Sequence, residues 1–210
     1  MVNNPNLYCK FLVPSEQVVD SVSKAIPAFK DVKKQIWPVG VETKKWSPGK
    51  LRLQKKDTLL LYIKGSISEE DKEIISHLKS KNMRVELIQY GMYEPMEYRS
   101  KLRRARAVVW FGAWESQGIA MLEAWSCDVP TFVRASCDCS EPAYHLCKSI
   151  IKYSPYLDSK CGFFFRTEKE LQVLLKSFIE ISGDSSSFSP RAWVKGNLET
   201  KKQLFKLLNL

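Results

Sequence analysis

Two glutamates in one segment, Glu115 and Glu123, are the side chains best placed to do chemistry. The sequence predicts a helix from Ser116, which can act as its N-cap, to about Cys127, so the two carboxylates would lie roughly 12 Å apart along one axis. That distance suits a sugar–diphosphate–ribose chain, whose hydroxyls would donate to the carboxylates while amides near Gln117 face the diphosphate. On spacing alone a plainer interpretation is better supported: Glu115 caps the helix, and Glu123 is solvated or ion-paired.

The elements that would position these glutamates alternate between strand and helix. Strands are predicted at the short apolar runs 58–63, 84–89, 107–111, 130–133 and 162–165. Helices are predicted from Ser68, from Pro95 to about Arg106, from Ser116 to about Cys127, over 141–151, from Thr167, and from Pro190 to the C-terminus. This alternation predicts an α/β fold, a Rossmann-like parallel sheet with helices on both faces.

Two further expectations concern the ends of the chain. The first 50 residues are less regular, with a strand expected over 8–13, a helix over 15–25 and a linker from Trp46. The helix after Thr167 should turn five apolar side chains inward, namely Leu171, Leu174, Leu175, Phe178 and Ile179.

Ligands of such sheets bind beyond the carboxyl ends of the strands, in the loops that lead into the helices. Three loops are expected there, over 64–66, 90–93 and 112–115. Tyr93 and Trp114 lie in these loops, where contact with a ligand and a structural role are both open.

The composition limits the class of protein. Of 210 residues, 44% are hydrophobic and 27% charged, which is typical of a globular protein and not of a disordered one. No apolar run reaches the ~18–20 residues that a membrane-spanning helix needs. The net charge of +10 indicates either an anionic partner or a plain basic surface. No nucleic-acid-binding pattern occurs, so we expect no nucleic acid as partner.

Cysteine and histidine usage argues against a metal site and for a reducing compartment. The six Cys include no Cys-x-x-Cys pair, and no secretion signal is apparent, so we expect reduced thiols in a cytoplasmic protein. His77 and His145 are the only histidines, and no tetrahedral ligand set is expected. No nucleophile motif accompanies them, so a hydrolase triad has no support.

The segment with both glutamates resembles the signature of retaining GT-B glycosyltransferases of family 4. In register with it are Glu115, Gly118, Glu123, Ala124, Cys127 and Pro130. Three upstream segments resemble further motifs of that family in the same order: 37–48 the crossover between its two domains, 61–65 the strand and glycine turn at the donor phosphates, and 90–91 the loop against the base. The resemblance extends from about residue 10 to residue 205.

The resemblance implies the C-terminal half of a GT-B fold, with residues 1–35 a remnant of a first domain and 36–210 the donor-binding domain. It implies a glycosyltransferase that moves a sugar from a UDP- or GDP-sugar to a glycan, lipid or protein acceptor with retention. Glu115 would contact the transferred sugar, Glu123 the ribose and Lys64 the diphosphate, with no metal or other cofactor required. The other donor-binding residues implied are Gly65, Ser66, Tyr90, Gly91, Met92, Tyr93, Trp114, Ser116, Gln117, Gly118 and Ile119.

The sequence departs from the family at the phosphate-binding turn. The family has Arg directly after the glycine, whereas this chain has Ser66. We assign the basic role to Lys64, which precedes the glycine, rather than to Lys72, which falls in an interior turn of a predicted helix. Only one helix and one strand separate Gly65 from Tyr90, so we expect a reduced sheet.

The first 35 residues are too few for an acceptor domain. We therefore expect a fragment, or a subunit whose acceptor domain is a separate chain, in the cytoplasm or at the cytosolic face of a membrane. The alternative is a non-catalytic module that binds nucleotide sugars. Such a module would bind nucleoside diphosphates and transfer sugar to no acceptor.

Overall fold

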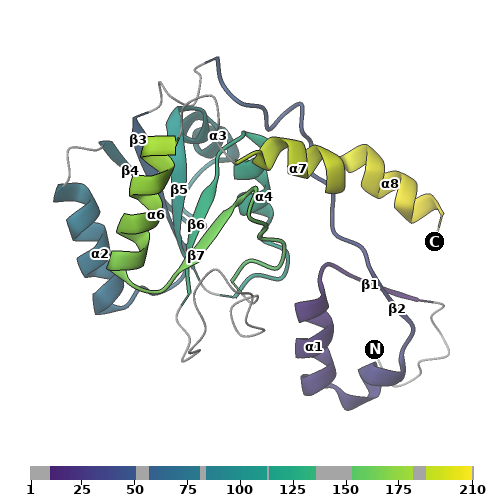
Figure 1. Ribbon diagram of the computed structural model, residues 1–210. Helices are drawn as coiled ribbons and strands as arrows, with labels where there is room; N and C mark the ends of the chain where they lie inside the picture. The colour runs from purple at the N-terminus through teal and green to yellow at the C-terminus, as the bar shows by residue number, and fades with distance from the viewer. Residues whose placement is uncertain are drawn as a thin grey trace.

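The computed structural model describes residues 10–50, 57–80, 84–112, 114–135, 153–181 and 188–209. Its main body is a five-stranded parallel sheet with the strand order β4-β3-β5-β6-β7 (Figure 1). The strands are β3 (Thr58–Ile63), β4 (Arg84–Gln89), β5 (Ala105–Phe111), β6 (Thr131–Arg134) and β7 (Gly162–Phe165). The helices against it include α2 (Glu69–Ser80), α3 (Pro95–Arg104), α4 (Ile119–Ser126) and α6 (Glu168–Ile181). The expected Rossmann-like sheet is confirmed.

The central strands β3 and β5 are apolar because helices cover the sheet on both sides. Leu60 pairs with Val108 and Leu61 with Val109 in the parallel register. Leu60 and Val108 point into one core, together with buried side chains of α3 and α4. Leu61 and Val109 point into the other core, with buried side chains of α2 and α6. This alternation places one helical layer on each face.

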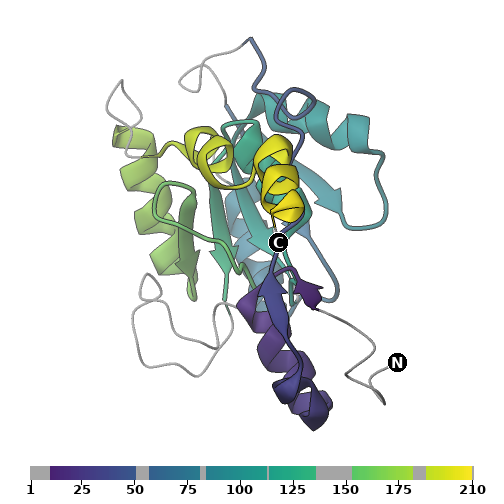
Figure 2. The same ribbon diagram turned by 90° about the vertical axis from the view of Figure 1, so that its right-hand side faces the viewer.

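A small N-terminal unit lies beside the main body (Figures 1 and 2). It contains the parallel pair β1 (Phe11–Val13) and β2 (Lys34–Ile36), the helix α1 (Glu16–Ala25) and the short 3-10 helix η2 (Pro27–Asp31). Val13, Phe29 and Val32 form its own core. The predicted helix over 15–25 is confirmed, with Ser15 as its N-cap.

The C-terminal segment forms two helices where one was predicted, α7 (Pro190–Asn197) and α8 (Thr200–Leu208). The break occurs where Val41 N–H donates to the Leu198 carbonyl at 2.8 Å and Thr200 N–H donates to the Val41 carbonyl at 3.1 Å. α7 packs against α4, with the rings of Trp125 and Trp193 edge to face at 5.4 Å. The two hydrogen bonds with Val41 thus lie at the junction between α7 and α8.

Other predicted details were wrong. The helix from Pro95 ends at Arg104, and β5 begins at Ala105 because that residue already pairs with Thr58. Ile179 was expected to face inward but is 38% exposed. The predicted helix over 141–151 lies outside the described residues. None of the described helices is long and apolar enough to cross a membrane.

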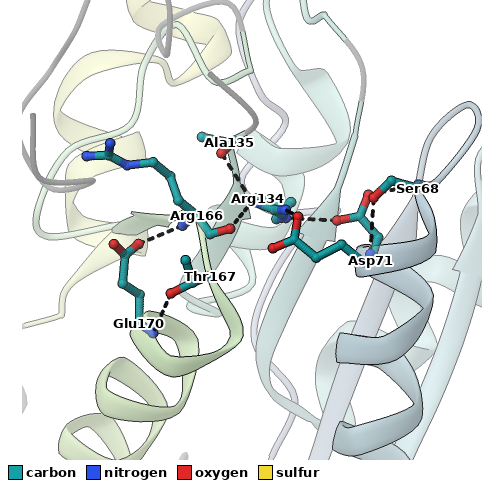
Figure 3. Close-up of polar contacts among 8 residues, drawn as sticks. Ser68, Asp71, Arg134, Ala135, Arg166, Thr167 and Glu170 are labelled. Carbon is teal, nitrogen blue, oxygen red and sulfur yellow. Dashed lines mark hydrogen bonds and ion pairs between the residues drawn. The ribbon is translucent and has the colours of Figure 1, made fainter. Parts of the chain in front are cut away.

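Arg134, the last residue of β6, connects three elements at the carboxyl edge of the sheet (Figure 3). Its buried guanidinium pairs with Glu70 at 2.6 Å and Asp71 at 2.8 Å, both in the first turn of α2. It also donates to the carbonyls of Ala135 and of Arg166, just after β7. These acceptors offset the cost of burying the charge, so Arg134 fastens α2 and β7 to β6.

Replacing Arg134 by Ala should lower the free energy of unfolding by about 3 kcal/mol, because it leaves the largely buried Asp71 without its partner. Urea denaturation measures this loss. Arg104→Ala is the matched control and should cost about 1 kcal/mol or less, because Arg104 is 41% exposed and its partner Glu86 still pairs with Arg84 at 3.3 Å. Equal losses in both variants would contradict the fastening role.

Candidate functional site

Lys64 and Glu115 form an ion pair at the carboxyl ends of β3 and β5. Lys64 Nζ lies 2.9 Å from Glu115 Oε2, and Glu115 is 6% exposed. The sheet brings them together, because Lys64 N–H donates to the Phe111 carbonyl at 2.8 Å and extends the β3–β5 ladder. Burial raises the pKa of Glu115, and the neighbouring Lys64 opposes that shift. The pair is therefore a buried carboxylate held by a partly exposed cation.

The same ammonium group lies among all three predicted loops. Lys64 Nζ is 5.0 Å from the ring centroid of Tyr90 and donates to the Trp114 carbonyl at 3.4 Å. Tyr90 N–H in turn donates to the Ile63 carbonyl at 2.8 Å, so its loop starts beside Lys64. A cation at this junction is well placed to neutralise a bound anion.

The helix α4 begins later than predicted. Gly118 is its N-cap, with a left-handed φ of 77° and no side-chain capping bond. Ser116 does not cap the helix, because it lies two residues before the N-cap, and its carbonyl accepts a hydrogen bond from Ser15. Glu115 therefore lies before the helix, and the predicted spacing of the two glutamates along one axis does not hold.

The start of α4 offers amide groups to a ligand. The first helical bonds run from Met121 and Leu122 N–H to the Gly118 carbonyl, at 2.9 and 3.0 Å. Among the described residues, none accepts from the N–H groups of Gly118, Ile119 or Ala120. Such amides, with the positive end of the helix dipole, favour an anion.

Glu123, in α4, lies near the aromatic side chains of Tyr93 and Tyr98. Burial raises its pKa to about 7, while Lys45 acts in the opposite direction. Burial and then the charge of Glu123 raise the pKa of Tyr93, whose hydroxyl lies 3.0 Å from that of Tyr62. The Tyr62 ring stacks on Trp110 at 3.8 Å. Tyr62 was not among the residues predicted for the site. Its signal in the sequence was a hydroxyl group in an otherwise aliphatic strand.

Several predicted donor-binding residues are exposed at this edge. Gly65 and Gly91 both adopt left-handed backbone, and Gly65 and Ser66 form an exposed turn after β3. The exposed apolar side chains are Tyr90, Met92, Trp114 and Ile119. They give a flat organic ligand apolar surface next to the cation.

The side chain of Gln117 makes two hydrogen bonds with Val39. Its side-chain amide accepts from Val39 N–H at 3.0 Å and donates to the Val39 carbonyl at 2.7 Å. The side chain is buried and faces the segment that contains Val39. It braces the loop before α4.

Lys72, the other basic residue considered, pairs with Glu69 at 2.5 Å and is 55% exposed on α2, whereas Lys64 pairs with the buried Glu115. Within the described ranges, no group of three or more His, Cys, Asp or Glu side chains could hold a metal ion.

No protein-family model matches the chain, and no curated protein matches it. Solved structures do match. Sucrose-phosphate synthase from Thermosynechococcus elongatus is 11% identical with a TM-score of 0.62, over 95% of this chain and 57% of its own. A TarM variant from S. aureus, solved with UDP, is 15% identical with a TM-score of 0.62, over 99% and 45%. The lipopolysaccharide outer core galactosyltransferase WaaB is 13% identical with a TM-score of 0.58, over 94% and 60%.

These three proteins are glycosyltransferases with the GT-B fold. The chain spans about half the length of each, with shares of 57%, 45% and 60%. At this identity the likeness shows the fold, which is that of the C-terminal half of a GT-B protein. The expected fold class is confirmed in full.

The raised pKa of Glu123 gives a test of its burial. A folded pKa of about 7 against 4.5 unfolded means that the folded state holds the proton longer, so stability is lost as pH rises from 4.5 through 7. Glu123→Gln removes this loss. In urea denaturation, the free energy of unfolding of the variant relative to that of the wild type should rise by up to about 3 kcal/mol between pH 5 and pH 8. Parallel profiles would show that Glu123 is solvated.

Proposed function

We propose that this chain is the nucleotide-sugar-binding half of a retaining GT-B glycosyltransferase of the family 4 type. The observation that carries the proposal is the Lys64–Glu115 pair beside the start of α4, at the carboxyl edge of the sheet. A cation, the amides at the start of a helix and a buried carboxylate together suit a diphosphate joined to a sugar.

In the proposed reaction an acceptor hydroxyl attacks the anomeric carbon, and the bond from that carbon to the diphosphate oxygen breaks. The electron pair leaves on the diphosphate, where negative charge grows in the transition state, and the proton of the acceptor hydroxyl passes to the departing diphosphate oxygen. Lys64 and the amides at Gly118 and Ile119 would stabilise that charge, and Glu115 would hold the sugar hydroxyls. These groups take the part of a metal ion, so we propose that no metal or other cofactor is required. Retention rests on the resemblance of the segment 115–130 to the family signature.

The nucleoside end is proposed to lie against Glu123 and the loop 90–93. The Glu123 carboxylate would accept hydrogen bonds from the ribose hydroxyls, and Tyr90 and Tyr93 would contact the base. A UDP- or GDP-sugar is the proposed donor. The structures of S. aureus TarM and pneumococcal GtfA, both similar in fold, were solved with UDP.

The acceptor side is proposed to come from another domain or subunit. Residues 1–35 would be the end of a first domain and 36–210 the donor-binding domain, working in the cytoplasm or at the cytosolic face of a membrane. The acceptor would be a glycan, lipid or protein. The share of the neighbouring chains covered, 45% to 60% for TarM and WaaB, also supports the alternative of a binding module that transfers nothing alone.

Nucleoside diphosphates should stabilise the protein. At least one of UDP, GDP, ADP and dTDP at millimolar concentration should raise the melting temperature by several degrees, since a ligand at ~100 times its Kd adds about 2.7 kcal/mol to stability. Thermal-shift measurement tests this. Inorganic diphosphate is the control for plain attraction to a basic surface. The donor site would be refuted if none of the four nucleotides raised the melting temperature, or if inorganic diphosphate raised it equally.

The two glutamates should affect different halves of the donor. Glu123→Ala should weaken the nucleoside diphosphate and the nucleotide sugar alike, by about 10-fold, because both carry the ribose. Glu115→Ala should weaken mainly the nucleotide sugar. Titration calorimetry of both ligands measures the difference, with Glu69→Ala on the exposed face of α2 as control. Equal effects of Glu115→Ala on both ligands would contradict its assigned role.

A further inference from the structure

The main chain of Glu115 is held by a side chain from a distant part of the sequence. Glu115 lies in the loop between β5 and α4, whose carbonyls have no partners within a strand or helix. Gln17, near the start of α1, donates from Nε2 to the Glu115 carbonyl. Ser15 Oγ donates to the Ser116 carbonyl at 2.7 Å. Two consecutive carbonyls of the loop are thus fixed by the N-terminal unit.

Gln17 has an unusual place in its helix. It is the buried residue of α1, at 8% exposure, whereas Val18, Val19 and Val22 are only partly buried against the small N-terminal core. Burying an amide is unfavourable unless it forms hydrogen bonds. The contact with Glu115 explains why a polar side chain holds this position.

Glu115 is thereby fixed at two points. Its carbonyl accepts from Gln17, and its carboxylate lies 2.9 Å from Lys64 Nζ. The next residues are braced as well, since the Gln117 side chain forms two hydrogen bonds with Val39. A carboxylate that must meet particular hydroxyls depends on such fixation, because a displacement of about 1 Å can greatly reduce productive contact.

We propose that Gln17 is a positioning residue that sets the direction of the Glu115 carboxylate and so makes recognition of the sugar half of the donor depend on the N-terminal unit. This inference rests on the proposed function, which assigns the sugar to Glu115. The nucleoside end is assigned to Glu123, in α4, and to Tyr93, in the loop after β4, and neither belongs to the loop that Gln17 holds. Loss of the Gln17 bond therefore affects the sugar and spares the nucleoside.

The test replaces Gln17 by Met, which keeps the length of the side chain and removes its donor. The ligands are the nucleoside diphosphate that gives the largest thermal shift and its matching nucleotide sugar. We expect affinity for the nucleotide sugar to fall about 3- to 10-fold, with affinity for the diphosphate unchanged within about 2-fold. Gln17→Glu, which sets a carboxylate against the Glu115 carbonyl, should show the same split at least as strongly.

Gln203→Met is the matched control. Gln203 is also buried, and its Nε2 donates to the carbonyl of Asn197, in the C-terminal helices. We expect both variants to lose melting temperature to a similar extent. Only Gln17→Met should lose affinity for the nucleotide sugar while keeping its affinity for the nucleoside diphosphate. A purely structural role of Gln17 would lower both affinities together or neither, and either result overturns the proposal.

A second readout needs no ligand. Heteronuclear 15N NOE values for residues 114–118 should fall in Gln17→Met and stay unchanged in Gln203→Met, because the loop loses its brace. Unchanged values would overturn the positioning role. If the wild type binds no nucleotide, the proposed function fails, and the NOE comparison still decides whether Gln17 orders the loop.

Discussion

The parallel pairing of β3 with β5 is the contact on which the rest of this structure depends. Parallel neighbours run in one direction, so the chain leaves both strands at the same edge of the sheet. The bond from Lys64 N–H to the Phe111 carbonyl carries that pairing one residue beyond β3. From there the Lys64 side chain reaches Glu115, although 50 residues separate them in the sequence. The order of the strands therefore brings the residues of the site together.

Three carboxylates near this edge differ in how their charge is compensated. Glu115 is buried against Lys64, and Asp71 is held by Arg134, which also binds the Arg166 carbonyl. Glu123 has a weaker compensation, from Lys45, and burial raises its pKa to about 7. Burial raises the pKa of both Glu115 and Glu123, and a carboxyl group with a raised pKa is a common feature of binding and catalytic sites.

The N-terminal unit is part of the site's support, although it has its own small core. Its contacts to the loop before α4 are hydrogen bonds to main-chain carbonyls, from Ser15 and Gln17. Such bonds depend on position and little on the identity of the residues that supply the carbonyls.

The net charge of +10 has little bearing on the site, where Lys64 is the cation that the three loops share.

Much of the fold could be predicted because strands buried on both faces leave continuous apolar runs. The bounds 58–63, 84–89 and 162–165 were predicted to the residue. The start of α4 was not, since the left-handed backbone of Gly118 leaves no trace in the hydrophobic pattern. The sequence by itself determined the α/β sheet and the loops at its carboxyl edge, because hydrophobic periodicity and the residues that begin or end helices and strands are local properties. Only the tertiary structure decided the Lys64–Glu115 pair, the Tyr62–Tyr93 contact and the brace from Gln17, because each joins residues 31 to 98 positions apart.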